Sequence, residues 1–138
     1  MIQCGSLTVP ELRKTSESMP FNKLLGVRIV RTHSDGVTIE CKLRHELLNS
    51  AGVIHGGVLA TLADTATGIA LHRHFGGRRP ITTTEMKINY LRPVKHGKAV
   101  ARAHILRVGK NLCVGRVDLF DGERKLSAVV IVTYIILA

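Results

Sequence analysis

The chain has 138 residues, of which 45% are hydrophobic and 22% charged, so it can bury the core of one domain and is not a disordered chain. Its longest apolar run, AVVIVTYIILA, is too short to cross a bilayer. The formal net charge of +10 leaves nucleic acid, an anionic membrane surface and a polyanionic small molecule open as partners, but the basic residues form no run and aromatic residues are few. We therefore expect neither a nucleic-acid nor a membrane partner.

The N-terminal residues lack the basic stretch and apolar core of a secretory signal, so we expect a soluble, cytoplasmic protein. The cysteines agree with a reducing compartment. There are three of them, Cys4, Cys41 and Cys113, so they cannot all pair within one chain, and no two have the CxxC spacing. A catalytic Cys–His pair stays open, although no local pattern favours one.

The segment TVPELRKTSES predicts a short helix near the N-terminus. Thr8 is suited to cap it, Pro10 fits its first turn, and Glu11 completes the capping-box spacing with Thr8. We assign residues 1–20 as a helical lead-in to a single domain that spans residues 1–138.

Two half-buried antiparallel strands follow. Apolar residues alternate with polar ones in GVRIVRT and in VTIECKLR, and the turn Ser-Asp-Gly at residues 34–36 joins the two segments.

The segment from about residue 56 to residue 73 predicts one long helix. Apolar residues occupy nearly every turn, so most of its circumference is buried, and the fragment GGRRP ends it. Its small residues fall roughly along one side, namely Gly57, Ala60, Thr61 and Gly68.

Four further strands are predicted after this helix, in ITTTEMKINYLRP, KAVARAHILRVG, NLCVGRVDLF and KLSAVVIVTYIIL. The simplest packing of all these elements is an α+β fold in which an antiparallel sheet of about six strands wraps around one long central helix. Such a sheet leaves part of the helix surface for a second subunit to cover.

Gly56 and Gly57 stand where the central helix begins. The first N–H groups of a helix have no intrahelical partner, and glycine lets a ligand oxygen approach them closely. This is the arrangement of an oxyanion hole for acyl transfer. His55 and Asn49 precede the glycines and are suited to orient a carbonyl or a water, with turn and capping roles as the alternatives.

Asp64 lies among apolar residues of the same helix, in a stretch with no lysine or arginine. It stands eight residues after Gly56, which is about 12 Å along a helix. Because Asp64 cannot reach a carbonyl held at its own helix start, the two groups serve one reaction only if they come from two copies of the chain. We therefore predict an obligate dimer with antiparallel central helices and two shared sites. A purely structural buried carboxylate is the alternative.

A combination of short motifs runs through the middle of the chain: Asn49, Gly52, His55-Gly56-Gly57 and Leu62-Ala63-Asp64. The segments MKINYLRPVKHGK, VARAHILRVGKNLCVGRVDLFD and KLSAVVIVTY follow it. Together, over roughly residues 20–136, these motifs resemble the hotdog-fold acyl-CoA thioesterases, in particular their PaaI-like (phenylacetic acid degradation-related) branch.

The resemblance implies a hotdog fold and hydrolysis of an acyl-CoA thioester, with an aryl or medium-chain acyl group. It implies that the Gly56 N–H binds the thioester oxygen, that Asp64 of the second subunit is the general base or the nucleophile, and that Asn49 holds water or thioester. A hydroxyl before the Met-x-Ile strand assists the water; Thr83 fits best, and its neighbours Thr82 and Thr84 stay open.

The remaining expectations concern partners and rival functions. Gly57 and four basic residues at strand ends are candidates to bind the substrate and its CoA phosphates: Arg92, Lys95, Arg107 and Lys110. We expect no metal and no cofactor other than the CoA of the substrate, and a homodimer that assembles into a tetramer as a dimer of dimers. Two alternatives stay open, an acyl-CoA binding or sensing protein without turnover, and a hotdog-fold enoyl-CoA hydratase or dehydratase.

Overall fold

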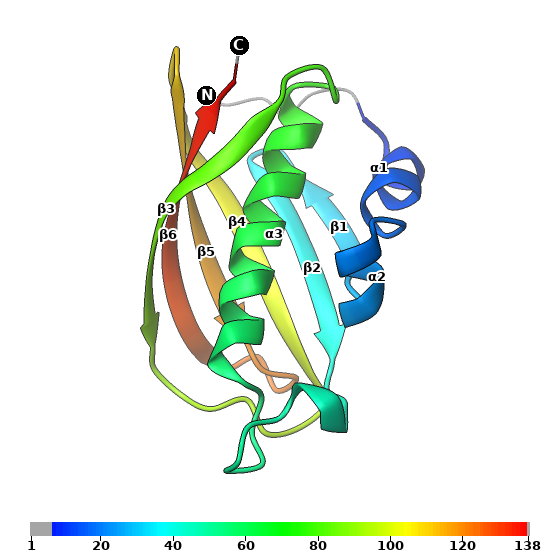
Figure 1. The fold of residues 1–138 in the computed structure, drawn as a ribbon, viewed down its shortest axis with the longest axis vertical. Helices are drawn as coiled ribbons and strands as arrows, with labels where there is room; N and C mark the ends of the chain where they lie inside the picture. Colours follow the sequence, from blue (N-terminus) through cyan, green and yellow to red (C-terminus); the bar gives the residue numbers. More distant parts are fainter. Residues whose placement is uncertain (1–6, 138) are drawn as a thin grey trace.

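The computed structural model describes residues 7–137, in which a six-stranded antiparallel sheet wraps around one long helix (Figure 1). This confirms the expected α+β architecture. The elements, in chain order, are α1 (Val9–Ser16), α2 (Pro20–Leu25), β1 (Arg28–His33), β2 (Gly36–Lys42), a 3-10 turn (His45–Leu47), α3 (Gly56–His74), β3 (Ile81–Tyr90), β4 (Lys98–Val108), β5 (Leu112–Phe120) and β6 (Leu126–Ile136).

The strand order in the sheet is β1-β2-β4-β5-β6-β3, with every neighbouring pair antiparallel. β3 follows α3 in the chain but lies beside the last strand, β6, so β1 and β3 form the two edges of the sheet (Figure 1). Each residue of β3 is exposed or only half-buried. An edge strand of ten residues that exposes one row of backbone groups is a surface that pairs readily with another strand.

α3 packs against the inner face of the sheet, chiefly against β4, β2 and β5. Most of the inner face of β4 is small, because Ala99, Ala101 and Ala103 supply it and all three are buried. The approach is also close at β5, where a Cβ added to Gly115 would lie 2.8 Å from Cγ2 of Thr67. The opposite side of α3 is not covered by the sheet and consists mainly of small or polar residues that are exposed or half-buried, namely Gly57, Ala60, Thr61, Asp64, Thr65 and Gly68.

The two N-terminal helices lie on the β1 side of α3 (Figure 1). The predicted capping box is confirmed at α1, where Glu11 N donates to Thr8 Oγ1 at 3.3 Å and Thr8 N donates to Glu11 Oε2 at 3.2 Å. Arg13 then fixes α1 to the sheet edge, because its guanidinium donates to Ile29 O at 2.9 Å. α2 adds to the expected elements; its first residue is Pro20, and its C-cap is a glycine in the left-handed region.

The cysteines that the structure describes form no disulfide. Cys41 and Cys113 are both buried and unpaired, whereas Cys4 lies outside the described residues. Between residues 7 and 137 we find no helix with the length and apolar character needed to cross a membrane.

The contact between Gly115 and Thr67 generates a stability prediction. We expect Gly115→Ala to lower the free energy of unfolding by about 1–3 kcal/mol, because the added methyl overpacks the interface between β5 and α3. In a Thr67→Ser background the same change costs less, since serine keeps the hydroxyl that donates to Ala63 O and loses the clashing methyl. Urea unfolding of the four proteins measures this coupling. Equal costs in both backgrounds contradict it.

Candidate active site

The start of α3 leaves one N–H group for a ligand. His55 is the N-cap, and its Nδ1 accepts a hydrogen bond from Gly57 N at 2.8 Å. The N–H of Val58 bonds to the His55 carbonyl at 2.9 Å. Among the hydrogen bonds of residues 7–137, none uses the N–H of Gly56. Of the two glycines expected to form an oxyanion hole, only Gly56 therefore offers a free donor, and the N–H of Gly57 is occupied by the imidazole.

The surroundings of Gly56 form a shallow hollow. Tyr90, at the end of β3, donates its hydroxyl to Gly56 O at 2.8 Å, and a Cβ added to Gly56 would lie 3.2 Å from the Tyr90 ring. The hollow measures about 340 Å³, and Asn49 borders it. Asn49 Oδ1 accepts from Ala51 N at 2.9 Å, which holds the loop, while its Nδ2 makes no hydrogen bond to any residue that the structure describes. Gly56 and Asn49 are thus brought together.

Asp64, in the third turn of α3, is held by two hydroxyl groups. Thr83 of β3 donates to Asp64 Oδ1 at 2.6 Å, and Tyr134 of β6 donates to Asp64 O at 2.7 Å and to Oδ1 at 2.8 Å. Within residues 7–137 no lysine, arginine or histidine forms an ion pair with this carboxylate. The second oxygen, Oδ2, receives no hydrogen bond from the described residues. Asp64 therefore presents one fixed oxygen and one available oxygen.

The structure distinguishes Thr83 from its neighbours. The pairing of β3 with β6 shifts between Thr83 and Glu85, and Thr83 stands directly opposite Tyr134. Because the two residues face each other across the strands, their hydroxyls converge on one carboxylate oxygen. Thr84 instead donates to Thr133 O at 3.2 Å, and Thr82 is exposed.

Tyr134 is a site residue that the sequence analysis did not identify. It is 7% exposed and stands in the inward-facing series of β6. Burial raises the pKa of Tyr134 far above its ordinary value, and the negative charge of Asp64 adds to the rise. The phenol therefore stays protonated and acts as a hydrogen-bond donor at every working pH. A signal for it exists in the sequence, since an inward tyrosine hydroxyl needs a buried acceptor.

Asp64 and Gly56 line separate hollows in one chain. The hollow at Asp64 measures about 350 Å³, is mostly apolar, and is bordered on the other side by α1 and α2; its lining residues are Thr15, Ser16, Met19, Phe21, Asn22, Asp64, Thr65, Gly68, Ile69, His72, Ile81 and Tyr134. The two hollows share no lining residue. Two turns of helix, about 12 Å, separate Gly56 from Asp64.

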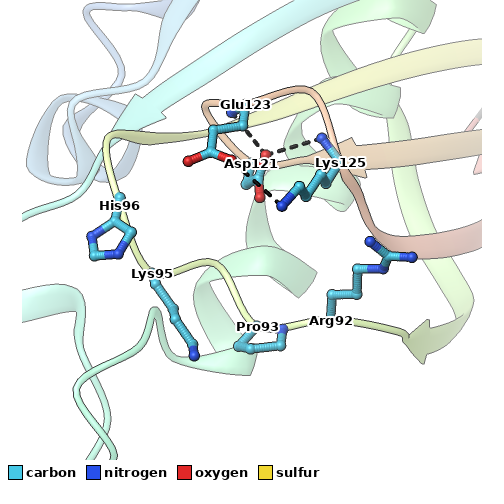
Figure 2. A pocket seen from close by; sticks show the side chains of 7 residues that line it. All are labelled: Arg92, Pro93, Lys95, His96, Asp121, Glu123 and Lys125. Atoms are coloured by element: carbon cyan, nitrogen blue, oxygen red, sulfur yellow. Dashed lines mark hydrogen bonds and ion pairs between the residues drawn. The ribbon is translucent and has the colours of Figure 1, made fainter.

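The four basic candidates divide into two pairs. Arg92 and Lys95 line a hollow of about 280 Å³ together with His96, opposite the β5–β6 turn (Figure 2). Arg92 also borders the Gly56 hollow, so this pair lies at the N-terminal end of α3. Arg107 and Lys110 lie at the β4–β5 turn, at the far end of β4. One chain thus places the two pairs at opposite ends of the sheet.

The structure disfavours the thiols as nucleophiles. Burial raises the pKa of Cys41 and that of Cys113, so the reactive thiolate form is suppressed at neutral pH. For the part of the chain from residue 7 to residue 137, we find no group of three His, Cys, Asp or Glu side chains that could hold a metal ion.

Comparison with known proteins identifies the family of this chain. The sequence model of the thioesterase superfamily matches residues 51–128, a span that contains Gly56, Asp64 and Thr83. Acyl-coenzyme A thioesterase 13 of Homo sapiens is 34% identical over 110 residues, which cover 78% of this chain and 78% of the relative. A medium/long-chain acyl-CoA thioesterase of Escherichia coli is 27% identical over 133 residues, 86% of each chain.

Solved structures agree as well. The crystal structure of a thioesterase from Haemophilus influenzae superposes with a TM-score of 0.91 at 28% identity, and the match covers 99% of this chain and 95% of that one. The hotdog fold that the sequence motifs imply is therefore confirmed. Assignment to the PaaI-like branch stays a prediction.

Proposed function

Because the chain belongs to the thioesterase superfamily and is a thioester hydrolase, we propose that it cleaves acyl-CoA thioesters to a free acid and CoA, at sites formed by two copies of the chain. One observation carries the proposal: α3 presents a carboxylate with one available oxygen and, at its start, an N–H without a partner among the described residues. These are the two groups that thioester hydrolysis needs. The human and E. coli relatives, both named acyl-CoA thioesterases, support CoA as the acyl carrier.

The separation of the two groups supports a dimer. Neither group reaches the other's hollow within one chain, since about 12 Å of helix lies between them. The side of α3 that carries Asp64 is not covered by the sheet and is lined by small residues, so a second helix is able to approach it closely. β3, the exposed edge strand next to it, is suited to pair with its own copy.

A single two-fold axis satisfies both the helix and the strand. Thr83 of β3 contacts Asp64 of α3, and Tyr90 of β3 contacts Gly56 of α3. Thr83 therefore lies at the height of Asp64 along the helix axis, and Tyr90 lies at the height of Gly56. Ala60 lies midway between the helix positions in sequence, and residues 86–87 lie midway between the strand positions. An axis beside these midpoints pairs both elements antiparallel and brings Asp64 of one copy to the level of Gly56 of the other.

The chemistry follows from these positions. The thioester carbonyl oxygen accepts from Gly56 N–H and from Asn49 Nδ2 of one copy, while His55 fixes the helix start through Gly57. Asp64 Oδ2 of the other copy takes a proton from a water as the water oxygen attacks the carbonyl carbon. The carbonyl electron pair moves onto the oxygen, and collapse of this intermediate expels the CoA thiolate. An oxyanion donor of this kind contributes roughly 3 kcal/mol.

A second route uses the same groups. Asp64 Oδ2 attacks the carbonyl carbon itself and displaces the thiolate, and water then hydrolyses the mixed anhydride to regenerate the carboxylate. Both routes need Asp64 ionised and oriented, and both place the developing negative charge at Gly56. The choice between base and nucleophile stays open.

The hollow beside Asp64 is suited to the acyl group, because it has a volume of about 350 Å³ and apolar walls from Met19, Phe21, Ile69 and Ile81. An aryl or medium-length acyl chain fits such a space. The CoA phosphates are then expected near Arg92 and Lys95 of the copy that supplies Gly56. In an antiparallel dimer, Arg107 and Lys110 of the copy that supplies Asp64 lie at the same end. Assembly of two dimers into a tetramer stays a prediction.

Asp64→Asn tests the proposed function. The amide keeps an oxygen for Thr83 and Tyr134 but removes the base, so we expect kcat/KM for thiol release to fall by about 10²–10⁴. A panel of aryl and straight-chain acyl-CoAs supplies the substrates, and retained acyl-CoA binding by the folded variant is the control. Full activity in the variant contradicts the role of Asp64. Binding without turnover by the unmodified protein indicates the carrier function instead.

Gly56→Pro tests the oxyanion donor. Proline is well tolerated at the first position of a helix, and His55, with φ −63° and ψ 135°, already has the backbone that a residue before proline prefers. The change removes the N–H, and we expect kcat to fall by about 10²–10³. Gly56→Ala is the matched control, because it adds the Cβ that crowds Tyr90 and keeps the N–H. Equal losses in the two variants indicate crowding rather than a lost donor.

A further inference from the structure

Gly68 is an unexpected residue at the middle of α3. It follows Asp64 by one helical turn, and glycine is a poorer helix former than every residue except proline. Its φ is not in the left-handed region, so the backbone does not require glycine there. A Cβ added at this position would lie 2.8 Å from the Tyr134 hydroxyl and 3.5 Å from Tyr134 Cζ. The missing side chain therefore makes room for the end of one tyrosine.

That tyrosine reaches the proposed catalytic carboxylate through this space. The Tyr134 hydroxyl lies 2.7 Å from Asp64 O and 2.8 Å from Asp64 Oδ1, and its single hydrogen is shared between them. The ring is buried, so the hydroxyl has a fixed direction. The same hydroxyl thus touches both the backbone and the side chain of Asp64, and it cannot do so if residue 68 carries a methyl group.

Thr83 completes the arrangement from the neighbouring strand. Its hydroxyl donates to the same oxygen, Oδ1, at 2.6 Å. Two donors on one carboxylate oxygen fix the rotation of the carboxylate. They leave Oδ2 for water or thioester. Thr83 belongs to β3 and Tyr134 to the neighbouring strand β6, so the two anchors come from adjacent strands.

We propose that Tyr134, in the space left by Gly68, is a positioning residue that aims Oδ2 of Asp64 at the substrate. This inference rests on the proposed function. It assigns Gly68 a role as well, since the glycine is needed only while residue 134 carries a hydroxyl. The pair should therefore behave as one unit, in stability and in catalysis.

Tyr134→Phe is the first test. Loss of one donor hydrogen bond frees the carboxylate to rotate. We expect kcat to fall about ten-fold and KM to change by less than about two-fold. Thr83→Val should lower kcat in the same way, and Thr83→Ser should restore it. An unchanged kcat, or a kcat that falls together with a large rise in KM and a lower melting temperature, overturns the inference.

Gly68→Ala is the second test, alone and combined with Tyr134→Phe. Alone, it should displace the tyrosine and lower kcat as Tyr134→Phe does, with a lower melting temperature. In the double variant the alanine methyl meets only ring carbon at ordinary contact distance, so Gly68→Ala should cost no further activity and no melting temperature. Additive losses of activity overturn the inference.

The wild-type protein and Asp64→Asn separate the two claims. If wild type hydrolyses acyl-CoA and Asp64→Asn does not, the proposed function stands, and a Tyr134→Phe variant that behaves like wild type overturns only the positioning role. If wild type hydrolyses no acyl-CoA, both the proposed function and this inference fall.

Discussion

The carboxylate of Asp64 is held on the uncovered side of α3 by hydroxyl groups rather than by a cation. A lysine or arginine beside it would stabilise the charge more strongly but would also occupy both oxygens and the space in front of them. Two hydroxyls from adjacent strands fix one oxygen and leave the other exposed to the groove between α1–α2 and β3. The two hydrogen bonds offset the free-energy cost of partly desolvating the carboxylate, and they leave the site open to a substrate. The small residues of this side of α3, the glycine at position 68 and the convergence of β3 and β6 all follow from that requirement.

The second constraint is the rise of the helix. A catalytic carboxylate and an oxyanion donor on one helix, eight residues apart, are separated by about 12 Å, far beyond the span of a single carbonyl carbon and its oxygen. The fold therefore offers two half-sites rather than one site. A second copy, related by an axis beside Ala60 and the middle of β3, completes each half-site and covers the exposed strand edge with the same contact.

Much of this was readable from the sequence, and the failures have physical causes. The capping box at Thr8 and the start of α3 at Gly56 depend on local spacing, which a sequence displays directly. α2 was missed because six residues carry too little periodicity, although a proline at its start and Gly26 at its end mark it. The sequence favoured Thr83, but the bulge that turns Thr83 inward in place of Thr84 is not visible in the sequence. Register of this kind depends on tertiary pairing.

The site, too, could be predicted from the sequence only in part. Asp64 was identified because a carboxylate among apolar neighbours is conspicuous. Tyr134 was missed, since a tyrosine in a core strand is ordinary until its hydroxyl is known to have a partner. The side-chain rotamer of His55 decides which backbone N–H its imidazole binds. The sequence therefore could not show that the N–H of Gly57 is occupied and that of Gly56 is free. The four basic residues lie at strand ends as expected, yet only the connectivity of the sheet reveals that they form two pairs at its two ends.

The most direct test of the account is complementation between two inactive variants. Asp64→Asn and Gly56→Pro are purified with different tags, mixed so that subunits exchange, and the heterodimer is isolated. A site shared between copies predicts that the heterodimer regains about half of the wild-type thiol release, because one of its two sites contains both intact groups. A heterodimer as inactive as its parents contradicts the shared site and places Asp64 and Gly56 in separate roles.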